Sequence, residues 1–218
     1  MAPSEPAACF CHRRMLVAHE ITALHDQLTA RWHIDPSFGR DIESHDWLLR
    51  VARQHRANFD LWHIEDEART PGASDADLAG VKRRIDTTNQ LRNDLAEDLD
   101  RALLEWLAAR HLPDCDAPLN SESPGLIIDR LSILALKIYH THDEAGRTSA
   151  PTGHAERNRD RLAILVEQRA DLARCLDALW RDTLSGARRF KLYRQLKMYN
   201  DPTLNPAIYR KSMNDTGE

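Results

Sequence analysis

Residues 120–140 read NSESPGLIIDRLSILALKIYH, and the rest of the fold is inferred outward from this stretch. Ser123 stands where a helix N-cap is expected, and Pro124 follows it in the first turn, where proline is well tolerated. Residues 126–138 are apolar on nearly every side, which is typical of a buried helix. We therefore expect a central helix surrounded by the other helices.

The same stretch carries ionisable residues that a buried helix cannot leave unpaired. At 100° per residue, Asp129, Arg130, Lys137 and His140 fall within one arc of about 100°. Charged groups taken out of water need hydrogen-bonding or ionic partners. Neighbouring helices are expected to supply them.

The composition favours helices and excludes several classes of protein. Charged residues make up 29% of the 218 residues, and only 8 are glycine. The net charge of −4 argues against a nucleic-acid partner. The sequence has no long apolar window for a membrane span and no apolar core of a signal peptide near its start. The four scattered cysteines favour free thiols in a reducing, cytoplasmic setting.

Apolar periodicity and helix breakers predict one all-α antiparallel bundle of about five long helices with a polar-lined interior cleft. Residues 13–186 form the bundle, 1–12 a flexible tail, and 187–218 a basic, aromatic segment that packs on the bundle and frays at its end. The tail holds Cys9, Cys11 and His12, but no second ligand pair at zinc spacing. Besides the central helix, the expected helices are 13–32, 42–69, 74–111 and 155–184, with 143–153 as a mobile connection.

Two of these helices carry polar residues at the same spacing, with offsets of 3, 7, 11 and 14 from the first member. Such offsets place each set on one side of its helix. We name these sets the polar seams. The first consists of His55, Asn58, Trp62, Asp66 and Arg69, and the second of Asp86, Asn89, Asn93, Glu97 and Asp100.

Two interpretations of the seams stay open. They could line a cleft shared with the central helix, and Trp62 and the asparagines would be unusual on a plain solvated face. Alternatively, they could form a closed salt-bridge network or a solvent face, because positive and negative charges are nearly balanced. If the acidic side chains came close enough to share a ligand in a pocket open to solvent, the cleft would be favoured. If they formed closed ion pairs, the network would be favoured.

For the cleft, the residue types suggest a binding site for an anion and a metal. Carboxylates on neighbouring helices suit Mg²⁺ or Mn²⁺. Histidines titrating near neutrality, with an adjacent carboxylate, suit acid–base chemistry. The candidate metal ligands are Asp66, Asp86, Glu97 and Asp100; the candidate catalytic groups are His55, His63 and Glu65; the candidate ligand-binding residues are Asn58, Trp62, Arg69, Asn89, Asn93, Asp129, Arg130 and Lys137.

Several strings in the chain resemble a known bacterial family. An RND string is present as Arg92-Asn93-Asp94 and a DRLSI string as residues 129–133, with NSExPGxIIDRLSI at 120–133 and KMYNDPxxNP at 197–206. The sequence is similar in these strings to the domain-of-unknown-function family 4254, over about residues 21–209. The family's activity is unknown, and the resemblance implies a companion of cell-surface glycan glycosyltransferases.

Two hypotheses of function follow. In the first, the protein binds a phosphorylated or nucleotide-like small molecule with a divalent metal, and hydrolysis or transfer of the phosphate would make it an enzyme. In the second, it is a non-catalytic accessory protein that docks onto a biosynthetic enzyme, such as a glycan glycosyltransferase, through its C-terminal segment.

Overall fold

The computed structural model describes residues 15–39, 46–196, 203, 204 and 206. They form an all-α bundle, as the sequence predicts, and the only β-type pairing in the described part is an isolated bridge between Leu119 and Arg189. No helix in the described part combines the length and the apolar character needed to cross a membrane. The helices are α1 (Ala18–Ile34), α2 (Trp47–Glu67), α3 (Asp75–Ala108), α4 (Pro124–Gly146) and α5 (His154–Leu184).

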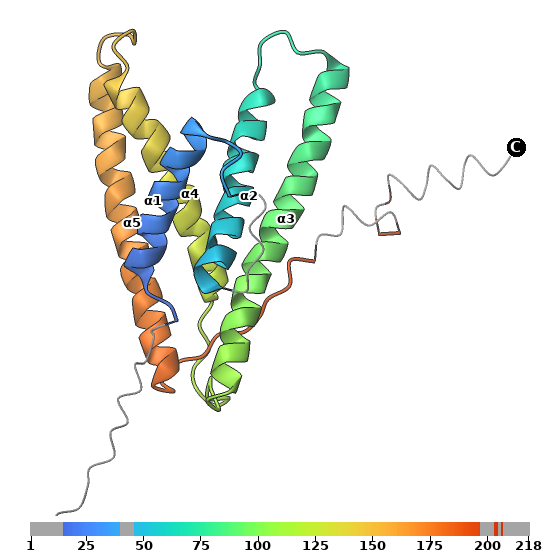
Figure 1. Cartoon of the computed structure of the whole chain (residues 1–218), viewed down its shortest axis with the longest axis vertical. Helices are drawn as coiled ribbons and strands as arrows, with labels where there is room; N and C mark the ends of the chain where they lie inside the picture. Colours follow the sequence, from blue (N-terminus) through green and yellow to red (C-terminus); the bar gives the residue numbers. More distant parts are fainter. Residues whose placement is uncertain (1–14, 40–45, 197–202, 205, 207–218) are drawn as a thin grey trace, which may run out of the picture.

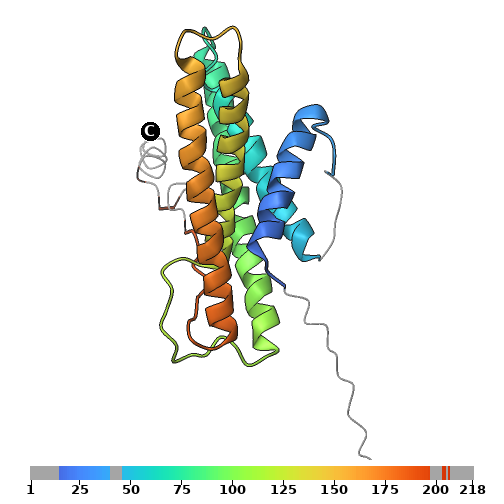
Figure 2. The same ribbon diagram turned by 90° about the vertical axis from the view of Figure 1, so that its left-hand side faces the viewer.

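Helix α4 is central, as predicted, because it packs against all four other helices. Its most extensive partner is α5, while α2 pairs most extensively with α3. Successive helices from α2 to α5 are antiparallel, and α1 runs parallel to α2 and α4 on one flank of the bundle (Figures 1 and 2). Helices α1, α2 and α4 therefore end near the same end of the molecule.

The apolar core occupies the other end, where α4 begins. Leucine and isoleucine side chains from α1, α3, α4 and α5 are fully buried there, together with Trp180 and Phe190. A smaller cluster of Trp32, Phe59 and Leu136 lies further along the bundle. The space between these clusters is filled by polar side chains, and these define the candidate site.

The start of α4 is built differently from the predicted N-cap. Ser123 occupies the N-cap position, but its hydroxyl donates to Asp100 on α3 instead of capping its own helix. Asp100 also accepts from the backbone N–H of Gly125 at 2.6 Å. A carboxylate from α3 thus satisfies the first turn of α4, a role that local sequence cannot reveal. Helix α3, by contrast, begins with a local capping box formed by Ser74 and Asp77.

Other boundaries also differ from the prediction. Helix α1 begins at Ala18 and α2 at Trp47, and residues 13, 14 and 42–45 lie outside the described part. Helix α4 continues to Gly146, so the predicted connection 143–153 is helical over its first residues. Glu144 binds Arg147 at 3.2 Å and His154 at 2.7 Å, which joins the end of α4 to the start of α5.

The C-terminal segment packs on the bundle over the part that the structure describes. The Arg189 N–H donates to the Pro118 carbonyl at 3.0 Å, and the Asn120 N–H donates to the Arg189 carbonyl at 2.7 Å. Phe190 is buried in the core. Residues 197–202 and 207–218 lie outside the described part, as do Cys9, Cys11 and His12. Cys115 and Cys175 are free and exposed.

Candidate functional site

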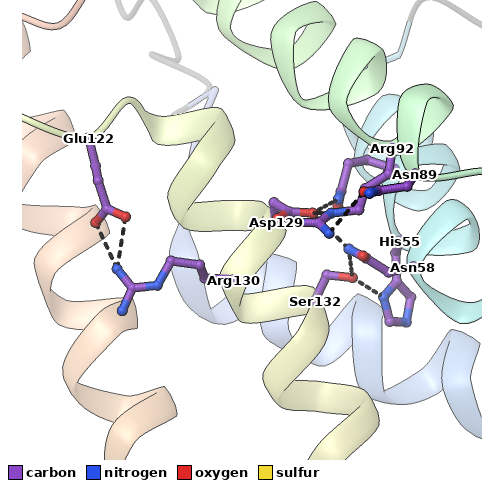
Figure 3. A network of polar contacts seen from close by, with 9 residues as sticks. His55, Asn58, Asn89, Arg92, Glu122, Asp129, Arg130 and Ser132 are labelled. Carbon is purple, nitrogen blue, oxygen red and sulfur yellow. Dashed lines mark hydrogen bonds and ion pairs between the residues drawn. The ribbon is translucent and has the colours of Figure 1, made fainter. Parts of the chain in front are cut away.

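Asp129, the buried carboxylate of the central helix, is held by residues from both polar-seam helices (Figure 3). The Arg92 guanidinium donates to both of its oxygens, at 2.9 Å from Nε and 2.7 Å from Nη2. Gln54 and Asn58 amides donate to the same carboxylate at 2.6 and 2.9 Å. The Asp129 side chain is only 7% exposed, and these hydrogen bonds and the ion pair with Arg92 compensate its buried charge.

A second set of hydrogen bonds continues this network toward α1. The Nε2 of His55 lies 3.0 Å from the His25 carbonyl, which can only accept, so Nε2 carries the proton. The Ser132 hydroxyl then donates to Nδ1 of His55 at 2.7 Å and accepts from the Asn58 amide at 2.9 Å. Burial lowers the pKa of His55 to about 3 and keeps the ring neutral.

These hydrogen bonds favour the structural interpretation for this part of the seams. His55, Asn58 and Asp129, predicted as catalytic or ligand-binding residues, are buried. Asn58 donates to Asp129, and Ser132 connects Asn58 to His55. We call the set of Gln54, His55, Asn58, Arg92, Asp129 and Ser132 the Asp129 network.

The four predicted metal ligands are not brought together. Among the described residues, Asp66, Asp86, Glu97 and Asp100 do not contribute to any group of three metal-binding side chains within 4.8 Å. Asp66 is exposed near the end of α2 and Asp86 pairs with Lys82, whereas Glu97 accepts from the Gln195 N–H at 2.6 Å. The physical reason is distance along α3, because residues 86 and 100 of one helix are about 21 Å apart.

Asp100 is buried, and it accepts the hydrogen bonds from Ser123 and Gly125 at the start of α4 that are described above. Burial raises its pKa to about 6, while the hydrogen bonds from Ser123 and Gly125 act in the opposite direction. The remaining predicted residues of the seams lie apart from it. Arg69 pairs with Glu65 at 3.3 Å on the surface, Asn89 accepts from Arg92 at 3.4 Å, and Asn93 is half-buried on α3.

Arg130 and Lys137 face α5, away from the seams. Figure 3 shows Arg130 on the opposite side of α4 from Asp129, where it binds both oxygens of Glu122 at 2.9 and 2.8 Å. Both cations line a cavity of about 910 Å³ between α4 and α5. These two cations of the central helix therefore face a cavity shared with α5 and do not oppose the polar seams.

A second cavity of about 460 Å³ adjoins the first, since Lys137 and Gln168 line both. Trp62 from α2 and His140 from α4 also line it, with ring centroids 4.8 Å apart and planes 4° apart. Arg161 contributes a second cation from α5. The sequence interpretation includes Trp62 and Lys137 but misses Arg161 and Gln168, because α5 shows a plain amphipathic pattern.

Three histidines meet beside this cavity, one from each of α1, α2 and α4. One ring nitrogen each of His33, His63 and His140 lies within 4.8 Å of the others. Burial lowers the pKa of His63 and of His140, and the neighbouring His33 lowers both further. We call these residues the histidine cluster. Only His63 belongs to the predicted catalytic groups.

A buried layer deeper in the bundle has the same spacing as the histidine cluster. His25 and His55 stack with centroids 4.4 Å apart, and Ser132 binds His55. Eight residues further along each parallel helix stand His33, His63 and His140. The sequence signal is therefore a pair of histidines eight apart on each of two helices. It becomes informative only once α1 is known to run parallel to α2.

Comparisons with known proteins give a family and no named relative. No curated protein and no solved structure matches the chain. The family model described as "Protein of unknown function (DUF4254)" matches residues 49–192. That range contains the whole Asp129 network and every residue that lines the two cavities between α4 and α5. The chain belongs to the DUF4254 family.

Proposed function

We propose that the protein binds an anionic, phosphorylated small molecule in the groove formed by the two adjoining cavities between α4 and α5. The observation that carries this proposal is a pair of cations in the smaller of the two cavities. Lys137 on α4 and Arg161 on α5 line the same cavity. Neither of them forms an ion pair with any residue in the described part of the chain. Two cations without carboxylate partners are suited to a phosphate group.

The other cations of the groove are already partnered. Arg130 is held by Glu122, and Arg188 lies 4.0 Å from Asp182 and donates to Asn120 at 3.2 Å. Because a bound phosphate would have to displace these partners, the anionic part of the ligand is assigned to the Lys137–Arg161 end. Gln168 beside them supplies an amide for further hydrogen bonds.

The size and lining of the groove suit a molecule with an uncharged portion. The larger cavity has an apolar floor that includes Ile133, Leu134 and Leu172, and its volume of about 910 Å³ is that of a small-molecule site. The Trp62 indole borders the phosphate end. Such a combination supports a nucleotide-like ligand or a sugar phosphate.

The proposal concerns binding. Hydrolysis or transfer of the phosphate with Mg²⁺ or Mn²⁺ on Asp66, Asp86, Glu97 and Asp100 stays a prediction, and those side chains are dispersed along α2 and α3. The accessory role also stays a prediction, because much of the segment that would dock lies outside the described residues.

A thermal-shift screen tests the proposal. The metal-free protein is heated with nucleoside phosphates and sugar phosphates, and in parallel with the corresponding nucleosides and sugars. We expect stabilisation by one or more phosphorylated compounds, and less or none by their unphosphorylated counterparts. Lys137→Ala and Arg161→Ala should each reduce the shift, whereas Arg159→Ala, which removes an exposed cation of α5 outside the groove, should not. Equal losses in all three variants would refute this placement of the anion.

A further inference from the structure

We propose that His33, His63 and His140 bind a divalent transition-metal ion, for which zinc is the probe. One ring nitrogen of each lies within 4.8 Å of the other two. A tetrahedral zinc ion with Zn–N bonds of about 2.0–2.1 Å holds its nitrogens about 3.3 Å apart. Small rotations of these half-buried side chains close the difference. The proposal involves residues other than Lys137 and Arg161 and does not rest on phosphate binding.

Two ring nitrogens in the cluster are buried without a partner in the described part of the protein. These are Nε2 of His33 and Nε2 of His140. The Nδ1 of His33 lies 2.7 Å from the Thr29 carbonyl, which can only accept, so Nδ1 is the donor and Nε2 is the nitrogen that can offer a lone pair to a metal. A buried polar atom without a partner destabilises the folded protein. A metal ion would satisfy such lone pairs.

Aromatic packing limits the orientations that the imidazole rings can adopt. Tyr139 stacks on His33 with centroids 4.2 Å apart, and Trp62 stacks on His140. Phe59 contacts His33 and His63 edge-on, at 5.0 and 4.5 Å. The hydrogen bond from His33 to Thr29 is the kind of outer contact that orients a histidine ligand and sets its tautomer. Rings held in this way lose little freedom when a metal binds.

The ligand set selects the class of metal. Imidazole nitrogens suit zinc, copper, nickel or iron, whereas Mg²⁺ and Mn²⁺ prefer carboxylate and carbonyl oxygens. Three histidines leave a position for water or another ligand. The cluster is bordered on two sides by hollows, because His140 lines the cavity that contains Lys137, while His33 and His63 line a cavity of about 560 Å³ with Arg56. In this role His63 is a metal ligand and not an acid–base group.

Zinc titration of the chelator-treated protein tests the site. Isothermal titration should show one zinc ion per chain in the wild type. We expect His33→Ala, His63→Ala and His140→Ala each to weaken binding by at least about tenfold, and the triple variant to lose this site. His19→Ala, at an exposed histidine of α1, should bind as the wild type does. Circular dichroism and melting curves establish that each variant is folded.

Two other places in the chain could hold zinc and must be separated from the cluster. They are Cys9, Cys11 and His12, and the exposed group Asp114, Cys115 and Asp116. The Cys9→Ser, Cys11→Ser, Cys115→Ser variant should keep full binding. A wild type that binds zinc no more tightly than the triple histidine variant would overturn the proposal. X-ray absorption of the zinc-loaded wild type gives a test without any substitution, because imidazole shells support the site and an oxygen-only or sulfur-containing shell overturns it.

Discussion

At the scale of the residue, two neighbours on α4 have opposite roles. Asp129 is buried in the Asp129 network and Arg130 is a half-exposed member of a surface pair. The sequence places both on one arc and cannot tell them apart. An arc of about 100° on a central helix spans two interfaces, so one end faces α2 and α3 and the other faces α5.

Asp129→Ala should destabilise the protein by about 3–5 kcal/mol, because it leaves the Arg92 guanidinium without its buried partner. Arg130→Ala, the matched control one residue on, should cost no more than about 1 kcal/mol. Urea unfolding of the three proteins measures both values. Equal costs for the two substitutions would contradict the distinction between a buried network and a surface pair.

His55 should make the stability of the protein depend on pH. Its pKa is about 3 in the folded protein, below the ordinary value of 6.5, because burial disfavours the charged ring. Between these values the unfolded chain binds the extra proton, so the free energy of unfolding rises with pH from about 3 to about 6.5. Above that range this contribution is fully present.

Replacement of His55 by Gln should flatten this rise, as measured by urea unfolding at a series of pH values. Asp100 contributes with the opposite sign, since its raised pKa of about 6 makes stability fall as the pH increases from about 3.8. That contribution is common to both proteins and cancels in the difference. His19→Gln, at an exposed site, serves as the control. An unchanged pH dependence in His55→Gln would argue against a neutral, buried His55.

At the scale of the element, the contact between α3 and the start of α4 depends on a glycine. A Cβ added to Gly125 would lie 2.3 Å from the Ala96 carbonyl oxygen and 2.8 Å from the Asp100 carboxyl carbon. Both helices must approach this closely for Asp100 to bind the first turn of α4. The sequence at Pro124 and Gly125 predicts a helix start, and in the structure Gly125 also allows the close packing of α4 on α3.

Gly125→Ala should be strongly destabilising, because the clash is with the backbone of α3 and no side chain can move aside to relieve it. Gly80→Ala, in α3 where the added Cβ meets nothing within 4 Å, should instead stabilise the protein by up to about 1 kcal/mol. Thermal melts of both variants test the pair. Similar melting temperatures for the two would show that the close approach is not required.

The elements themselves follow from the sequence more readily than their contacts. Periodicity and caps locate five helices and identify α4 as central, and the capping box at Ser74 is local. The binding of Asp100 to α4 and the meeting of three histidines depend on the directions and registers of helices far apart in the chain. For the same reason, the acids at 86 and 100 share a face of α3 without sharing a site.

At the scale of the whole molecule, the interior changes character along the bundle axis. An apolar core lies where α4 begins, the Asp129 network follows, and the histidine cluster lies toward the ends of α1, α2 and α4. The first two regions consist mainly of buried side chains, and in the second the Asp129 carboxylate is held by Arg92, Gln54 and Asn58. The solvent-reachable cations and imidazoles lie beside the groove, where binding can occur without disrupting the core.

The central claim is that the groove between α4 and α5 holds a phosphorylated molecule through Lys137 and Arg161. The most direct test is isothermal titration with the phosphorylated compound that gives the largest thermal shift. Each cation–phosphate contact contributes about 1.5–3 kcal/mol, so the Lys137→Ala, Arg161→Ala double variant should bind about 100-fold more weakly or worse. Arg159→Ala should retain wild-type affinity. Undiminished binding by the double variant, or no binding of any phosphorylated compound by the wild type, would contradict the claim.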